Sequence, residues 1–114
     1  MQVATADKGA YTLLSVSGRM DATSSPGFDD AARALGPRIA KNVLLDLQGL
    51  EFVSSSGLRS FLALAKTVQR AGFQTAFCSL GPMIEEVFRI AGFMSILKIY
   101  PDESSAAAGL AVSG

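Results

Sequence analysis

Three consecutive serines and a glycine, Ser54-Ser55-Ser56-Gly57, stand between an apolar run and an amphipathic helical pattern. The first N–H groups of a helix have no partner within it, and the helix dipole places about half a positive charge there. A hydroxyl or a phosphate is therefore stabilised at this position. Either one serine caps the helix or one accepts a phosphoryl group. The triplet alone favours capping, because capping serines are much commoner than regulated ones.

The composition restricts the classes of partner. The chain has 114 residues, of which 49% are hydrophobic and 18% charged, so we expect one compact domain over residues 1–114. Its 10 basic and 10 acidic residues cancel, and no basic run suits a nucleic acid or an anionic membrane. The N-terminus lacks the long apolar core of a signal peptide or a membrane span, so we expect a cytoplasmic location.

Few residues could perform catalysis or hold a metal. The chain contains no histidine and a single cysteine, Cys78, within an apolar run that is typical of a buried thiol. A serine hydrolase using Ser55 or Ser56 would lack both its usual base and a Gly-x-Ser-x-Gly turn. The glycines form no phosphate-binding loop with a following lysine. We therefore expect no enzyme activity, no metal and no cofactor.

The first part of the chain predicts a hairpin and a helix. Residues 2–6 and 11–17 alternate like strands around turn chemistry at residues 7–10. A loop then leads to Ser25 as the expected N-cap and Pro26 at the first helical position, and Gly36-Pro37 ends the helix.

From there strands and helices alternate. This predicts an α/β fold in which a mixed, mostly parallel sheet opens with an antiparallel hairpin, continues in β–α repeats, and is covered by about four helices. The loops that follow parallel strands lie at one edge of such a sheet, so residues 18–25, 48–57 and 79–82 should meet there. The expected elements are strands 42–47, 73–80 and 96–100 and helices from about 57 to 72, 82 to 91 and 103 to 112.

Several ordered motifs together resemble a known family, the STAS domain of bacterial anti-sigma-factor antagonists. The resemblance covers nearly the whole chain without large insertions. The motifs are Val16-Ser17-Gly18-Arg19-Met20-Asp21, Val43-Leu44-Leu45-Asp46-Leu47, Val53-Ser54-Ser55-Ser56-Gly57-Leu58, Cys78-Ser79-Leu80-Gly81-Pro82 and Val87-Phe88-Arg89-Ile90-Ala91-Gly92-Phe93.

The resemblance implies a module that binds an anti-sigma serine kinase and is released when that kinase phosphorylates it. A cognate phosphatase is a further candidate partner. In the family, the acceptor immediately precedes the glycine of an Asp-Ser-Ser-Gly-Leu motif. Carried over, the acceptor is Ser56, with Ser55 as second choice, and Ser54 occupies the aspartate position.

The expected partner-binding residues lie on two segments. Asp21 keeps the aspartate of the family pattern, and Asp21 and Thr23 also fit plain loop positions. The complete expected set is Asp21, Thr23, Ser54, Ser55, Gly57, Leu58 and Arg59.

Two other interpretations stay open. One is the regulatory STAS domain attached to anion transporters, against which the lack of a membrane segment argues. The other is a scaffolding relative whose serine is never modified, which the replacement of aspartate by Ser54 allows. The sequence names neither the kinase nor the final client, and it does not indicate nucleotide binding or the oligomeric state.

Overall fold

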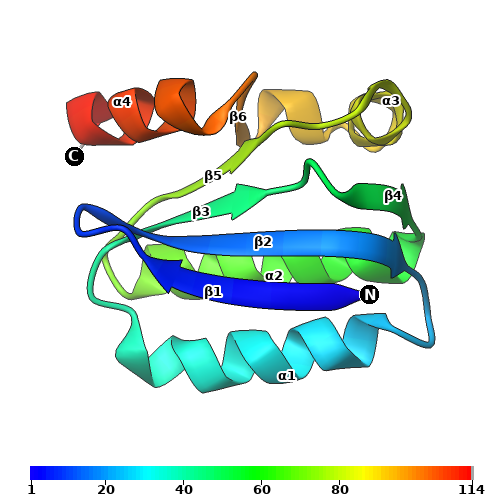
Figure 1. Cartoon of the computed structure of the whole chain (residues 1–114), viewed down its shortest axis with the longest axis horizontal. Coiled ribbons are helices and arrows are strands. Elements are labelled where there is room, and N and C mark those ends of the chain that lie inside the picture. The colour runs from blue at the N-terminus through cyan, green and yellow to red at the C-terminus, as the bar shows by residue number, and fades with distance from the viewer. Residues whose placement is uncertain (114) are drawn as a thin grey trace.

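The chain opens with an antiparallel hairpin, as the sequence predicts. The computed structural model describes residues 1–113, and Figure 1 shows β1 (Gln2–Asp7) lying along the much longer β2 (Tyr11–Met20). The tight connection uses Gly9, whose φ of 84° is a left-handed conformation that glycine adopts without strain. The hairpin supplies one edge of the sheet.

The remaining strands extend the sheet in parallel from β2. The strand order is β1-β2-β3-β5-β6, with β3 at Asn42–Asp46, β5 at Thr75–Cys78 and β6 at Lys98–Tyr100. β3 pairs with β2, β5 with β3, and β6 with β5, all in parallel. The predicted mixed, mostly parallel sheet is confirmed.

One strand differs from the sequence prediction. β4 (Leu50–Val53) lies within the segment that we expected to be a loop, and it pairs in parallel with the last residues of β2. The first part of β2 pairs with β3, and its last residues, from Gly18, pair with β4. Between Gly18 and Arg19 the pairing skips Glu51, which is an extra residue on β4. A bulge of this kind bends the strand that carries it, here β4, which leads into the serine segment.

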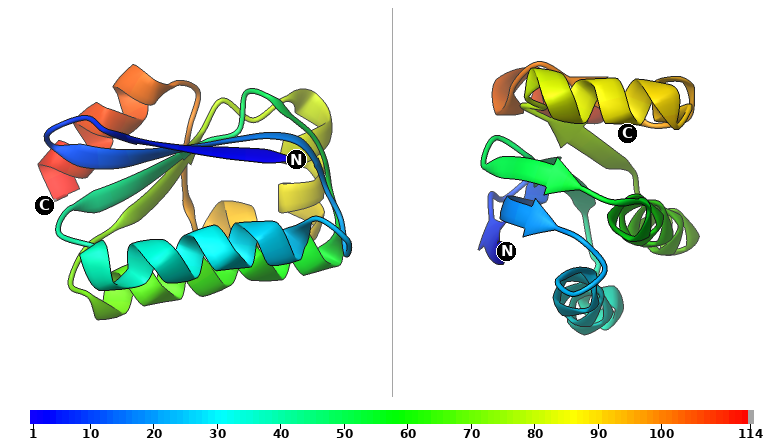
Figure 2. Two further views of the ribbon diagram at one scale, coloured as in Figure 1. Left: turned by 60° about the horizontal axis from the view of Figure 1, so that its bottom comes forward. Right: turned by 90° about the vertical axis from the view of Figure 1, so that its right-hand side faces the viewer.

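Three helices cover one face of the sheet and a fourth covers the other. α1 (Ser25–Leu35), α2 (Ser55–Arg70) and α3 (Pro82–Ile90) bury their apolar sides in one core with β2, β3, β4 and β5. α4 (Glu103–Ser113) packs on the opposite face, and the two views of Figure 2 show this layering. Short 3-10 turns, Gly36–Arg38 and Phe93–Ser95, follow α1 and α3.

Phenylalanine rings join the three helices of the larger core to the sheet. Neighbouring rings contact edge-on or tilted, with centroids 5.2 to 6.2 Å apart. Such pairs add about 0.5–1.5 kcal/mol each beyond the burial of their area. They hold α2 against both α1 and α3. The five rings are Phe28, Phe61, Phe77, Phe88 and Phe93.

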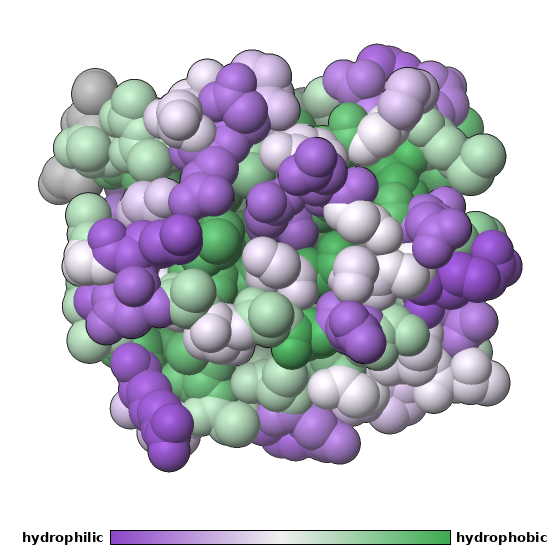
Figure 3. Space-filling model, viewed as in Figure 1, coloured by the Kyte–Doolittle hydropathy of each residue, from purple (hydrophilic) through white to green (hydrophobic). Residues whose placement is uncertain are grey.

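The smaller core lies beneath α4. Ala106 and Leu110 pack on Leu44 and Cys78, and the pale green surface at the upper left of Figure 3 reflects the small apolar residues of this helix. Burial raises the pKa of the Cys78 thiol to about 11. No helix within residues 1–113 has the length and apolar character needed to cross a bilayer.

Candidate functional site

The first turn of α2 is built on Ser54. Its extended backbone (φ −90°, ψ 175°) marks it as the N-cap, and its Oγ accepts a hydrogen bond from the Gly57 N–H at 3.3 Å. The Ser54 N–H donates to the Met20 carbonyl at 2.8 Å, which ties the end of β2 to the start of the helix. Serine and aspartate are both among the residues that cap helices best, and here Ser54 is the cap.

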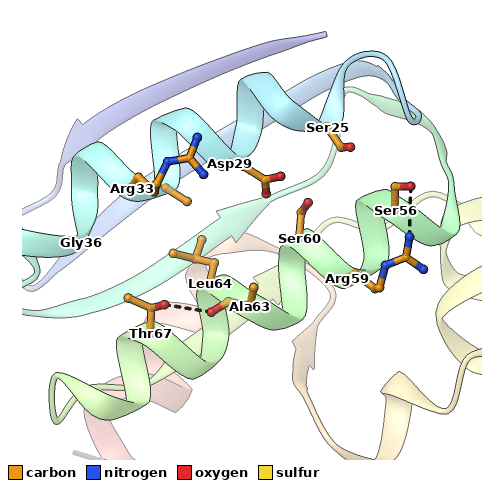
Figure 4. A pocket seen from close by; sticks show the side chains of 11 residues that line it. Ser25, Asp29, Arg33, Gly36, Ser56, Arg59, Ser60, Ala63, Leu64 and Thr67 are labelled. Carbon is orange, nitrogen blue, oxygen red and sulfur yellow. Dashed lines mark hydrogen bonds between the residues drawn. The ribbon is translucent and has the colours of Figure 1, made fainter.

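The next two serines lie inside the helix, which begins earlier than the expected Gly57. Ser55 is exposed and Ser56 is half-buried. The Ser56 Oγ accepts a hydrogen bond from Nη2 of Arg59 at 3.3 Å, as Figure 4 shows. A hydroxyl at a helix N-terminus beside a guanidinium group is well suited to carry a phosphoryl group.

Gly57 allows α2 to begin close to the sheet. A Cβ atom at this position would lie 2.7 Å from Val53 Cγ2 and 3.0 Å from Met20 Cγ. Both distances are shorter than ordinary carbon contacts, so a side chain would push the helix away from β2 and β4. Glycine at this position therefore sets where Ser56 stands at the edge of the sheet.

The loop after β2 is a turn organised by Asp21. Its Oδ1 accepts from the Thr23 N–H at 3.0 Å, the Thr23 hydroxyl at 2.7 Å and the Ser24 N–H at 3.1 Å. The Ser24 hydroxyl donates back to the Arg19 carbonyl at 2.8 Å. These bonds lower the pKa of the Asp21 carboxyl to about 2, and the bond from the Thr23 hydroxyl has the largest effect.

The expected cap of α1 is wrong by one residue. Ser24 is the N-cap and Ser25 is the first helical residue. Ser24 makes no side-chain capping bond, because its hydroxyl belongs to the Asp21 turn.

The three expected loops gather at one edge. Backbone bonds join Ser54 to Met20 at 2.8 Å and Leu47 to Cys78 at 3.0 Å, and α3 contacts β4. The right-hand view of Figure 2 looks onto this edge and shows the starts of α1, α2 and α3. The parallel sheet thus brings the Asp21 turn and the serines together, as the topology predicts.

A groove of about 720 Å³ runs between α1 and α2 and ends at Ser56. Figure 4 shows Ser25 and Asp29 of α1 facing Ser60 of α2 across it. None of these three residues was predicted from the sequence as part of a groove, since the groove exists only once α1 packs on α2. The available signal was the spacing of Ser60, four residues after Ser56 and so on the same face of the helix.

The expected partner-binding residues differ in what they can offer a partner. Thr23, Ser55 and Arg59 are exposed. Gly57 is buried, and Leu58, 9% exposed, belongs to the core. Within residues 1–113, no group of three or more histidine, cysteine, aspartate or glutamate side chains is arranged to hold a metal ion.

Comparison with known proteins gives consistent matches. A protein-family model described as the STAS domain matches residues 2–106. A Bordetella bronchiseptica protein named as an anti-sigma factor antagonist, BtrV, is 40% identical over 68 residues, which are 60% of this chain. The aligned segment spans 59% of that relative's length.

Solved structures share the fold at lower sequence identity. An anti-sigma factor antagonist from Mycobacterium paratuberculosis superposes with a TM-score of 0.88 at 21% identity, covering 96% of this chain and 92% of the other. The Bacillus cell fate determinant SpoIIAA in its phosphorylated form gives a TM-score of 0.69 at 14% identity, covering 92% and 96% of the two chains. At these identities the likeness concerns the fold.

Proposed function

Because this chain belongs to the STAS domain family, we propose that it is an anti-sigma factor antagonist that binds an anti-sigma serine kinase and is released when Ser56 is phosphorylated. The observation that carries the proposal is the Ser56 hydroxyl, half-buried at the N-terminus of α2 and bonded to Arg59. The name of the Bordetella relative and the phosphorylated form of SpoIIAA support it. The protein then acts in the cytoplasm as a regulatory binding module and catalyses nothing itself.

The partner docks on the edge formed by the Asp21 turn and the start of α2. Thr23, Ser55 and Arg59 supply exposed contacts there. Gly57 and Leu58 contribute by position, because one brings α2 close to the sheet and the other anchors it in the core. Ser54 contributes as the cap that orders this turn.

The modification needs a catalyst from outside this chain. The kinase transfers the γ-phosphoryl group of ATP to the Ser56 oxygen, a base on the kinase takes the hydroxyl proton, and ADP leaves. The product carries about −1.5 to −2 additional charge near neutral pH. The domain itself tolerates this charge, since the first N–H groups of α2 favour an anion.

The interface with the partner tolerates the phosphate charge less well than the isolated domain does. A dianion enclosed between two proteins must be desolvated or matched by a cation. A mismatch of about 3 kcal/mol weakens binding more than a hundredfold. Phosphorylation can therefore end the complex without any refolding of the domain.

The test is a pull-down from an extract of the source cell, with bound proteins identified by mass spectrometry. The baits are wild type, Ser56→Ala, Ser56→Asp and protein phosphorylated at Ser56. We expect an anti-sigma kinase on the first two baits and its loss from the charged ones. Ser104→Ala and Ser104→Asp, at the exposed second position of α4 on the opposite face of the sheet, are the matched controls and should both retain it.

A second measurement maps the phosphate. The captured kinase is incubated with ATP and each unmodified bait, and the site is located by peptide mass spectrometry. Phosphate on Ser56 in wild type and none on Ser56→Ala is expected. Equal capture by every bait would mean that the chain is a constitutive binding module, and phosphate on Ser55 would make that serine the acceptor in place of Ser56.

A further inference from the structure

Three of the ten basic residues form ion pairs with carboxylates, and Arg59 is among the seven that form none within the described residues. Arg33 pairs with Asp30, Lys41 with Asp7, and Arg89 with two glutamates. Within the described residues Arg59 forms no ion pair, and its side chain donates only to the Ser56 hydroxyl.

Helix stability does not explain this placement. A cation close to a helix N-terminus is unfavourable, because the dipole there is already positive. The unpaired charge of Arg59 therefore fits an anion that arrives later.

The groove beside this pair contains two unused hydrogen-bond donors. Ser25 and Ser60 are 5% and 7% exposed, and both line the groove that ends at Ser56. Neither hydroxyl has a hydrogen-bond partner among the described residues. Within residues 1–113 the only fully buried side-chain polar atom without a partner is the Thr75 hydroxyl, so the Ser25 and Ser60 oxygens are open to the groove and can donate to an acceptor bound there.

Two helix N-termini reach the same place. Ser25 is the first residue of α1, and Ser56 is the second residue of α2. Both side chains line the groove, and Figure 4 shows them at the same end of it. The positive ends of both helix dipoles therefore act on any anion bound there.

We propose that a phosphate on Ser56 is bound within the same chain, by the Arg59 guanidinium, at the end of the α1–α2 groove next to Ser25 and Ser60. The inference rests on the proposed function, because it takes Ser56 as the residue that carries the phosphate. The guanidinium supplies charge-assisted hydrogen bonds, and the two hydroxyls supply neutral ones. Asp29, which also lines the groove, opposes the phosphate and keeps it at the Ser56 end.

The binding gives phosphorylation two effects on the partner face. It adds an anion, and it withdraws the exposed cation of Arg59 from contact with the partner. The loss of affinity for the partner would then be larger than the loss that the charge on Ser56 alone produces.

The experiment uses the full chain with phosphoserine inserted at position 56 by genetic code expansion, so no kinase is needed. Phosphorus NMR follows the second ionisation of the phosphate, whose ordinary pKa is about 6. In Arg59→Gln this phosphate pKa should rise by about half a pH unit or more, since a nearby cation favours the dianion. Asp29→Asn should lower it. Circular dichroism checks that each variant is folded.

Two matched controls separate binding at the groove from a general charge effect. Arg33→Gln removes a cation from the same groove that already pairs with Asp30, and it should leave the phosphate pKa unchanged. Phosphoserine at the exposed position 55, which does not line the groove, should be insensitive to Asp29→Asn.

Equal phosphate pKa values in wild type and Arg59→Gln would overturn the proposal, and no response to Asp29→Asn would overturn the groove location. Neither result touches the proposed function, which the pull-down tests separately. Conversely, the NMR result stands even if no kinase modifies Ser56.

Discussion

The close approach of α2 to the sheet predicts the effect of Gly57→Ala. The added Cβ would lie 2.7 Å from Val53 Cγ2, 3.0 Å from Met20 Cγ and 3.3 Å from the Met20 carbonyl oxygen. Overpacking of this kind costs about 1–3 kcal/mol. Alanine regains about 1 kcal/mol over glycine in a helix. We expect the free energy of unfolding to fall by about 1 kcal/mol, and Tm by about 4 °C.

Urea unfolding followed by circular dichroism measures this change. Gly36→Ala is the matched control, because Gly36 has helical backbone angles and nothing within 4 Å of an added Cβ. It should be neutral or slightly stabilising.

A double-mutant cycle tests whether Val53 is the cause. Val53→Ala alone removes buried methyl groups and should cost about 2 kcal/mol. Since it also removes the atom nearest the added Cβ, the double variant Gly57→Ala with Val53→Ala should lose about 1 kcal/mol less than the sum of the two singles. Additivity within about 0.5 kcal/mol would refute the reasoning. So would a Gly57→Ala variant that is as stable as Gly36→Ala.

Three further predictions concern other parts of the molecule. Ser54→Ala removes the cap bond to Gly57 and should cost about 1 kcal/mol in urea unfolding, whereas Ser54→Asp should stay within a few tenths; equal losses would contradict the capping role. The hydrogen bond from Tyr11 to Glu103 raises the pKa of Tyr11 from 10.0 to about 12. The stabilisation by this hydrogen bond is therefore complete below pH 10 and lost as the pH rises to 12. The stability difference between wild type and Tyr11→Phe should shrink over that range, and a constant difference would contradict the role of the hydrogen bond. Cys78, buried and with a raised pKa, should react with iodoacetamide far more slowly in the folded protein than in urea, as followed by intact mass; equal rates would mean that α4 does not cover it.

Local patterns were enough to predict most of the fold. The turn at residues 7–10 and the prolines at the starts of α1 and α3 are signals within a few residues, and the structure has a hairpin and helices there. β4 had no comparable signal. It has four residues, and its partner is the far end of β2, about thirty residues earlier in the chain, so no pattern within a few residues indicates the pairing.

For the candidate site, too, some features could be predicted from the sequence and others depend on how the elements pack. The position of the serines at a helix N-terminus follows from the sequence, but three identical side chains cannot show which one caps. The backbone decides it, since Ser54 is extended and Ser55 and Ser56 are helical. The groove depends on how α1 packs on α2, so Asp29 carried no signal of its own and Ser60 carried only its spacing from Ser56.

The Asp21 turn is closed by bonds within its own residues. Thr23 and Ser24 donate to the Asp21 carboxylate, and Ser24 donates back to the Arg19 carbonyl, so hydrogen bonds fix the loop in one conformation. A molecule that docks there meets a surface that is already ordered. It avoids the cost of about 0.5–1.5 kcal/mol for each side chain that binding would otherwise immobilise. Association at this edge then does not have to wait for a loop to fold.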